Sequence, residues 1–173
     1  YVSNSVLRDL YLKLQELSMA RPVSGLLTDM VCCPGGDFCS LANARSITVA
    51  EDINRRYKSL DKLESLGNID LRISGCMNSC GHHHIGNIGI LGVDKDGKAF
   101  YQLLLGGNSG ENGKASLGKI IAKAFAEDEI SDAVENILQH YLSKRDKNET
   151  FRNTVARLGN ASFAEAANKA RKS

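Results

Sequence analysis

Residues 69–105 read IDLRISGCMNSCGHHHIGNIGILGVDKDGKAFYQLLL, and this stretch decides the fold. Apolar and polar residues alternate from 69 to 74, which is the period-two pattern of a half-buried strand that leads directly to a cysteine. Two further apolar segments, 85–93 and 99–105, flank the turn sequence Asp-Lys-Asp-Gly at 94–97. This arrangement predicts a β-hairpin that continues the sheet beyond the cysteines.

The sequence before this stretch predicts one strand, one loop and one helix. Leu26 to Val31 is a short apolar run that indicates a buried strand, followed by a loop from Cys33 to Cys39. Thr48 and Glu51 have the spacing of a capping box, which predicts a helix start at this position. The predicted apolar face of that helix consists of Ala50, Ile53, Tyr57 and Leu60.

The sequence after the hairpin is mainly helical. Residues 106–113 are rich in Gly, Asn and Ser and predict a loop, whereas 120–125 fits either a last strand or a helix start. Residues 130–142 carry a strong helical stripe that we assign to the core. We expect one or two short helices in the tail, the last opening with Ser162 and Glu165 as a capping box. The predicted fold class is α+β, a mixed β-sheet flanked by helices with the cysteine loops at one end of the sheet.

The first residues indicate a separate unit. Residues 5–19 form an amphipathic pattern, with Leu7, Leu10, Leu14 and Leu17 on one face. Because the chain starts with Tyr1 and not Met, we expect it to begin inside a longer polypeptide. We therefore divide it into residues 1–24, a helix from an upstream unit, and residues 25–173, one domain.

Composition and charge exclude several classes of protein. The 173 residues have a formal net charge of +2, with basic and acidic residues interspersed, so we expect no nucleic-acid partner. We also expect no membrane partner, because no apolar run approaches the length of a bilayer span. Five cysteines without a secretory signal favour metal or redox chemistry over disulfides, and thiolates of this kind imply a cytoplasmic location.

Four cysteines form two spaced pairs, Cys33-x5-Cys39 and Cys76-x3-Cys80. Both pairs lie in segments rich in turn-forming residues, and converging thiolates on tight turns suit an iron–sulfur cluster. A structural zinc fits the five-residue gap less well, because zinc knuckles usually have two to four residues between their ligands. Four unrelated buried cysteines are a third interpretation. Cys32 could shift the first pair by one residue, but we expect it to be a small buried side chain at the end of a strand.

Both cysteine segments resemble a known family. Residues 31–42, VCCPGGDFCSLA, and 74–89, SGCMNSCGHHHIGNIG, are similar to the two cluster motifs of the sirohaem-dependent nitrite/sulfite reductases. The resemblance covers residues 25–173, and it implies that residues 1–24 come from an upstream, ferredoxin-like unit. It further implies a [4Fe-4S] cluster, sirohaem, and the six-electron reduction of sulfite to sulfide or of nitrite to ammonia.

The resemblance assigns metal ligands by position. It implies that Cys33, Cys39, Cys76 and Cys80 hold the cluster, and that Cys80 also bridges to the sirohaem iron. Asn78 is a candidate for a sirohaem contact, or for the left-handed position of the turn. The catalytic residues are not identified. His82, His83 and His84 could donate protons, bind adventitious metal, or simply pack in the loop.

One departure from the family is the scarcity of Arg and Lys near the cysteines, because a macrocycle with many carboxylates requires such contacts. We expect upstream domains of the same polypeptide to supply them, and a ferredoxin or flavoprotein to supply electrons. The isolated chain is then inactive. The alternative is a non-catalytic module in which zinc binds the four cysteines, or a cofactor-free chain.

Overall fold

The computed structural model describes residues 1–110 and 113–172. Within that part, a six-stranded mixed sheet has the order β1-β2-β3-β4-β5, and β6 also pairs with β4. β1, β2 and β3 are parallel, whereas β4 is antiparallel to β3, β5 and β6. The strands are β1 (Val31–Cys32), β2 (Leu71–Ser74), β3 (Ile88–Lys95), β4 (Lys98–Leu105), β5 (Lys119–Ile120) and β6 (Phe125–Ala126).

The central hairpin is formed as the sequence predicts. β3 and β4 pair over their whole length, from Ile88 opposite Leu105 to Lys95 opposite Lys98. The two turn residues, Asp96 and Gly97, have φ values of 54° and 75°. A two-residue turn with both φ values positive matches the right-handed twist of the flanking strands.

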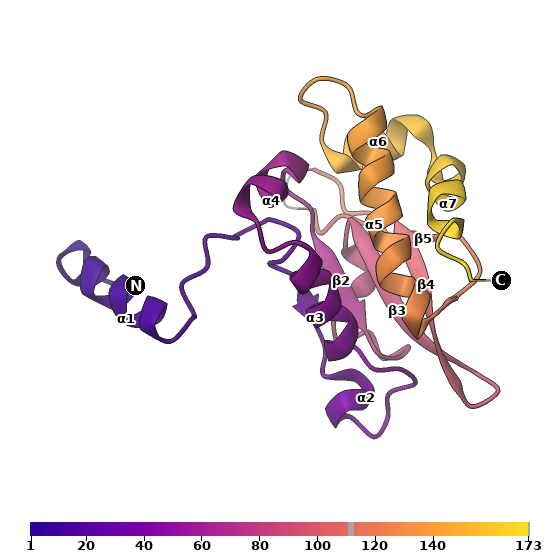
Figure 1. Ribbon diagram of the computed structural model, residues 1–173, viewed down its shortest axis with the longest axis horizontal. Coiled ribbons are helices and arrows are strands. Elements are labelled where there is room, and N and C mark those ends of the chain that lie inside the picture. Colours follow the sequence, from indigo (N-terminus) through magenta and orange to yellow (C-terminus); the bar gives the residue numbers. More distant parts are fainter. Residues whose placement is uncertain (111–112, 173) are drawn as a thin grey trace.

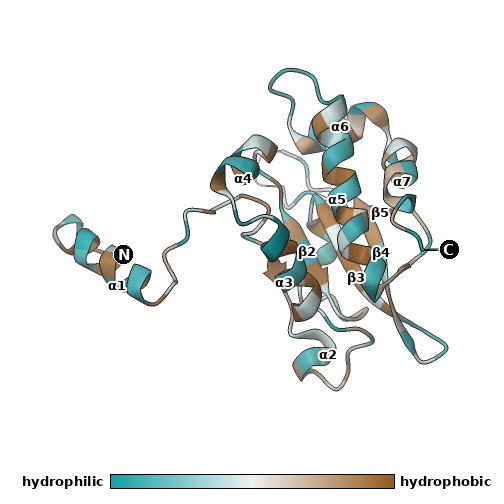
Figure 2. Ribbon diagram, viewed as in Figure 1, coloured by the Kyte–Doolittle hydropathy of each residue, from teal (hydrophilic) through white to brown (hydrophobic). Residues whose placement is uncertain are grey.

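The main helices build the core against one side of the sheet. In Figure 1, α3 and α5 cross in front of the strands, and α7 lies beside α5. Figure 2 shows that apolar residues concentrate on the strands beneath them. The buried residues of β2, β3 and β4 belong to the same core cluster as those of α3, α5, α6 and α7. These helices are α3 (Ile47–Arg56), α4 (Leu60–Leu66), α5 (Glu127–Lys144), α6 (Phe151–Leu158) and α7 (Asn160–Asn168).

The first helix is separate from this core. A turn of 3-10 helix, η1 (Asn4–Val6), runs into α1 (Leu7–Glu16), which lies apart from the sheet in Figure 1. Its leucine face is open: Leu7 and Leu17 are 54% and 67% exposed. The helix is therefore formed close to where the sequence predicts it, but without a partner for its apolar face among the described residues.

Two local predictions need correction, one open alternative is decided, and one predicted loop lies partly outside the described residues. The strand predicted at residues 26–31 is limited to Val31–Cys32, because a turn closed by Asp29, whose backbone N–H donates to the Leu26 carbonyl, precedes it. The loop after it contains one helical turn, α2 (Gly35–Phe38). The ambiguous segment 120–125 contributes to two short strands, β5 and β6, and not to a helix. Of the predicted loop 106–113, residues 111 and 112 lie outside the described part.

The predicted capping boxes are also wrong. α3 begins at Ile47, one residue before Thr48, whose hydroxyl instead donates to Glu127 (3.4 Å). α3 ends at Arg56, so Leu60 starts the next helix. Ser162 lies inside α7, and its hydroxyl contacts the Nε2 atom of His140 (2.7 Å). In each case a tertiary contact takes the side chain that the local spacing assigned to a cap.

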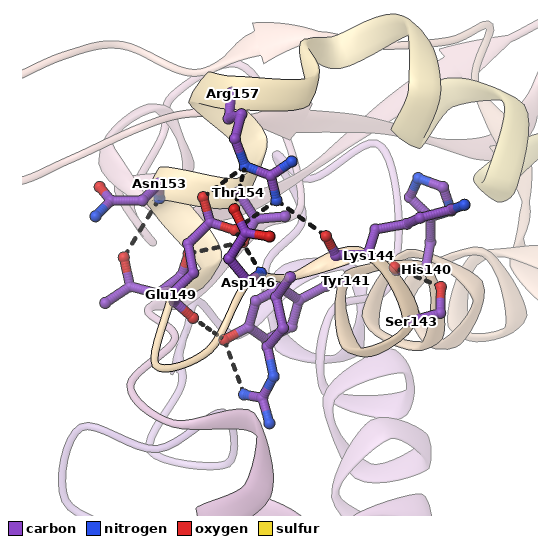
Figure 3. Close-up of polar contacts among 11 residues, drawn as sticks. His140, Tyr141, Ser143, Lys144, Asp146, Glu149, Asn153, Thr154 and Arg157 are labelled. Carbon is purple, nitrogen blue, oxygen red and sulfur yellow. Dashed lines mark hydrogen bonds and ion pairs between the residues drawn. The ribbon is translucent and has the colours of Figure 1, made fainter.

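A polar network ties the end of α5 to α6 (Figure 3). The carboxylate of Glu149 accepts hydrogen bonds from Arg157 at 2.6 and 2.9 Å and from the Thr154 hydroxyl at 2.9 Å. The Tyr141 hydroxyl donates to the Glu149 carbonyl (3.0 Å). The Arg157 guanidinium, with the other donors, lowers the pKa of Glu149 to about 2. The network fixes the turn that brings α6 and α7 back over the core.

Within residues 1–110 and 113–172, no helix is both long and apolar enough to traverse a bilayer.

Candidate functional site

The two cysteine loops leave the sheet side by side. β1 and β2 are parallel neighbours with Cys32 opposite Ile73, and the Cys33 N–H donates to the Ile73 carbonyl (3.1 Å). Cys33 follows β1 directly, and Cys76 lies two residues beyond β2. Because the carboxyl ends of parallel strands meet at the same edge of a sheet, both loops start at one place.

Backbone hydrogen bonds then hold the loops against each other. The Gly75 N–H donates to the Cys33 sulfur (3.1 Å), and the Gly75 carbonyl accepts from the N–H groups of Asn43 and Ala44 (2.9 and 3.0 Å). A side chain at Gly75 would place its Cβ 2.7 Å from both the Ala44 carbonyl oxygen and the Gly35 Cα. Glycine is therefore required where the first loop crosses the second.

The five cysteines are free thiols in different surroundings. Cys76 is buried, Cys33 and Cys39 are half-buried, and Cys80 is exposed. Cys32 packs against the core and donates its S–H to the Cys33 carbonyl (3.2 Å). Burial, with the nearby Cys33 and Asp37, raises the pKa of the Cys32 thiol to about 12. Cys32 thus lies at the end of a strand, as the sequence predicts, but it is half-buried and not fully buried. Its raised pKa makes it poorly suited to bind metal as a thiolate.

Asp37, inside the first cysteine loop, organises the start of α3. Its carboxylate accepts from the backbone N–H groups of Ser46 (3.0 Å) and Ile47 (2.9 Å) and pairs with Arg45 (2.9 Å). Burial acts to raise the pKa of Asp37, but the Ile47 N–H, the Arg45 guanidinium and the Ser46 N–H together lower it below its ordinary value. The carboxylate thus caps α3 from outside the helix and anchors the loop between Cys33 and Cys39.

The structure places the four cysteines on two adjoining loops but does not gather their sulfurs into one group among the described residues. In the part of the chain that the structure describes, no three His, Cys, Asp or Glu side chains are grouped closely enough to hold one metal ion. A tetrahedral zinc requires such a group, because all four ligands converge on one atom. In a [4Fe-4S] cluster each cysteine binds a different iron, so the sulfurs surround a larger body. Four thiols spread over two adjoining loops are compatible with a body of that size.

The loops also present apolar side chains to the surface. Phe38, Leu41 and Met77 are 84%, 72% and 82% exposed. All three are adjacent to one of the four cysteines or two residues from it. Several large apolar side chains exposed on neighbouring loops are typical of an interaction surface.

The three consecutive histidines have three different surroundings. His82 is exposed, with a left-handed φ of 52°. His83 is completely buried, and neither ring nitrogen has a hydrogen-bond partner among the described residues. Burial, with the neighbouring His84, lowers the pKa of His83 to about 4. His84 stacks on His83 at 3.9 Å between ring centroids, and its Nδ1 contacts the Ser79 hydroxyl (3.2 Å).

Asn78 lies exposed between Cys76 and Cys80. The left-handed residue of this turn is Ser79, with a φ of 58°, and not Asn78. The conformational explanation for an asparagine at this position is therefore wrong, because its neighbour adopts the conformation that asparagine tolerates.

Sequence reasoning missed the parts of the site that depend on contacts between distant segments. Asp37 and Ser46 are nine residues apart, and only the folded loop brings them together. Two features of the sequence could have pointed to this contact: the Gly-Gly pair before Asp37, which allows a tight turn, and the serine at the N-cap of α3. Neither feature indicates that the Asp37 carboxylate accepts a hydrogen bond from the Ser46 N–H.

The structure thus places four free cysteines on two adjoining loops at one edge of a mixed sheet. The chain belongs to the nitrite and sulphite reductase 4Fe-4S domain family, whose sequence model matches residues 26–173.

Individual relatives agree with this assignment. The chain is 32% identical over 126 residues to a ferredoxin–nitrite reductase of Leptolyngbya laminosa, covering 70% of this chain and 24% of the relative. It is 29% identical over 149 residues to a ferredoxin sulfite reductase of Mycolicibacterium paratuberculosis, covering 80% and 26%. The structure of the Mycobacterium tuberculosis NirA protein superposes with a TM-score of 0.74 at 25% identity, covering 94% of this chain and 31% of that one. The chain thus spans about a quarter of the length of these curated relatives.

Proposed function

We propose that this chain is the cluster-bearing domain of a sirohaem-dependent reductase that acts on sulfite or nitrite. The observation that carries the proposal is the crossing of the two cysteine loops, where the Gly75 N–H meets the Cys33 sulfur at 3.1 Å. Family membership over residues 26–173 supports the same assignment. The relatives include enzymes named for each substrate, so the proposal covers both.

Four cysteines are proposed to hold the cluster: Cys33, Cys39, Cys76 and Cys80. When bound, the cluster and sirohaem supply the single-electron transfers by which the substrate gains six electrons. The chain contributes a rigid frame, because β1 and β2 fix the starting points of both loops. It also contributes the Gly75 N–H, which donates to a ligand sulfur and thereby favours its negative charge.

Cys80 is the proposed bridge to the sirohaem iron. It is the exposed member of the four, whereas Cys76 is buried. A thiolate shared between two cofactors must be open on the side away from the cluster, and the exposure of Cys80 supports this role. Asn78, exposed two residues away, is the proposed polar contact to the macrocycle.

The remaining parts of the enzyme are proposed to lie upstream. Exposed Phe38, Leu41 and Met77 provide an apolar surface for the macrocycle and for the upstream domains that hold it. The open leucine face of α1 supports the assignment of residues 1–24 to an upstream, ferredoxin-like unit, and of residues 25–173 to the cluster domain. An external ferredoxin or flavoprotein supplies electrons, and the free thiols suit the reducing cytoplasm.

The proposal is tested in the full-length polypeptide that contains this chain, with a reduced dye as electron donor and with sulfite and nitrite as separate substrates. We expect production of sulfide or ammonia, and at least a hundredfold loss of rate for Cys80→Ala. Cys32→Ala is the matched control and retains activity, because the half-buried Cys32 thiol packs against the core and is not one of the proposed ligands. Full activity in Cys80→Ala, or reduction of neither substrate by the wild type, would contradict the proposal.

A further inference from the structure

Ser46 occupies the N-cap position of α3 but does not cap the helix. A serine at this position usually accepts a hydrogen bond from the backbone N–H two or three residues later. Here the Ser46 side chain makes no such bond. Asp37 takes over that function by accepting from the Ser46 and Ile47 N–H groups (3.0 and 2.9 Å). The hydroxyl of Ser46 is therefore free for another partner.

That partner is the sulfur of Cys33. Ser46 is completely buried, and its Oγ lies 3.7 Å from the Cys33 Sγ, within the longer range of hydrogen bonds to sulfur. The same sulfur accepts from the Gly75 N–H (3.1 Å). The Cys33 sulfur thus has one backbone donor, the Gly75 N–H, and one hydroxyl partner, Ser46, either of whose two atoms could be the donor in the free thiol.

The space around the hydroxyl depends on two glycines. A Cβ on Gly35 would collide with the Ser46 Oγ, and a Cβ on Gly75 would lie 3.0 Å from it. Gly35 belongs to the first cysteine loop and Gly75 to the second. The hydroxyl consequently lies at the point where both loops meet. The space that it occupies exists only because residues 35 and 75 have no side chain.

We propose that Ser46 is a positioning residue for the cluster, whose hydroxyl donates to the Cys33 thiolate and raises the reduction potential of the cluster. This inference rests on the proposed function. A thiolate bound to iron has no proton, so the hydroxyl is the donor in the pair. Reduction adds one electron and no proton to the cluster, and a donor to a ligand sulfur stabilises the more negative state.

The experiment compares the chain with its Ser46→Ala variant after anaerobic reconstitution with ferrous iron and sulfide. Spectroelectrochemical titration gives the midpoint potential of each. We expect Ser46→Ala to retain iron and to titrate at a more negative potential. At the wild-type midpoint, its ratio of reduced to oxidised cluster falls by up to about tenfold, which is about 59 mV for a one-electron couple.

Two further variants make the result specific. Ser131→Ala removes a buried hydroxyl from α5 and leaves the potential unchanged. Ser46→Gly also removes the hydroxyl and adds no volume to this buried site, so it should likewise titrate at a more negative potential, and it preserves the test if Ser46→Ala fails to hold a cluster. A wild-type potential in either Ser46 variant that holds a cluster would overturn the inference. Failure of the wild type to take up any cluster would instead overturn the proposed function.

Discussion

Acidification from pH 7 to pH 5 should destabilise this chain through His83, a completely buried imidazole without a hydrogen-bond partner among the described residues. Its pKa is lowered from 6.5 to about 4 because burial, and then the neighbouring His84, disfavour the charged ring. Below pH 6.5 the unfolded chain therefore takes up a proton that the folded chain does not. The free energy of unfolding consequently falls as the pH falls, until the folded chain is protonated near pH 4.

The size of this effect follows from the shift. One unmatched proton changes stability by about 1.4 kcal/mol per pH unit, so the 1.5 units from pH 6.5 to 5 give about 2 kcal/mol as an upper limit. The change that isolates it is His83→Leu, which keeps the volume roughly constant and removes both unpartnered nitrogens. At pH 7 we expect this variant to be as stable as the wild type or up to about 1 kcal/mol more stable.

The assay is urea unfolding of the reduced, iron-free chain at half-unit steps between pH 7 and 5, followed by far-ultraviolet circular dichroism. The difference between His83→Leu and wild type should grow by about 2 kcal/mol over that range. His82→Asn is the matched control, because His82 is exposed and has a left-handed backbone that asparagine tolerates. It should follow the wild type. Parallel curves for wild type and His83→Leu would refute the assignment of a buried neutral imidazole.

Three other predictions concern the frame of the site and the α5–α6 turn. Gly75→Ala places a Cβ 2.7 Å from Ala44 and Gly35 backbone atoms, so it should cost about 1–3 kcal/mol in urea unfolding and abolish iron uptake; unchanged uptake would argue against tight loop crossing. Asp37→Ala removes the acceptor that caps α3, which should cost about 1–2 kcal/mol, and an unchanged unfolding midpoint would show that the cap is dispensable. Glu149→Gln should lower the thermal midpoint at pH 7, and the deficit should shrink as the pH falls from 4.5 towards 2, because the wild-type carboxylate, with a pKa of about 2, loses its charge there; a deficit that persists at pH 2 would contradict this.

The features that were predictable from sequence are those encoded locally. The hairpin follows from alternating apolar residues on both sides of Asp96-Gly97, and its register is fixed by the turn itself. α5 follows from an apolar stripe long enough to bury one full face. The pattern that predicts each of these two elements lies within the element itself, so no knowledge of distant segments was required. The mixed sheet flanked by helices follows from their order along the chain, and relatives of known structure confirm it.

The helix starts were not predictable because distant groups compete for the same side chains. Thr48 and Glu51 have the spacing of a capping box, yet Asp37 reaches the first N–H groups of α3 from the preceding loop. Likewise Ser162 pairs with His140 on α5 and does not begin a helix. Local spacing states what a side chain could bond to, and tertiary packing decides between the options.

The candidate site also has a part that is encoded locally and a part that depends on contacts between distant segments. The spacing of the cysteines identifies the two loops, because chemistry that needs four thiolates leaves a pattern in the sequence. The partners of the Cys33 sulfur leave no such pattern: Gly75 and Ser46 are 42 and 13 residues from it. The burial of His83 is equally invisible, since three identical residues in a row give no reason to distinguish the middle one.

The most direct test of the central claim is the iron and acid-labile sulfide content of the anaerobically reconstituted chain, measured with its visible spectrum. The account predicts about four irons and four sulfides per chain, with a broad absorption that bleaches on reduction, and loss of both in Cys33→Ala but not in Cys32→Ala. A colourless chain that binds one zinc and no sulfide would contradict it, because the four cysteines would then form a structural zinc module.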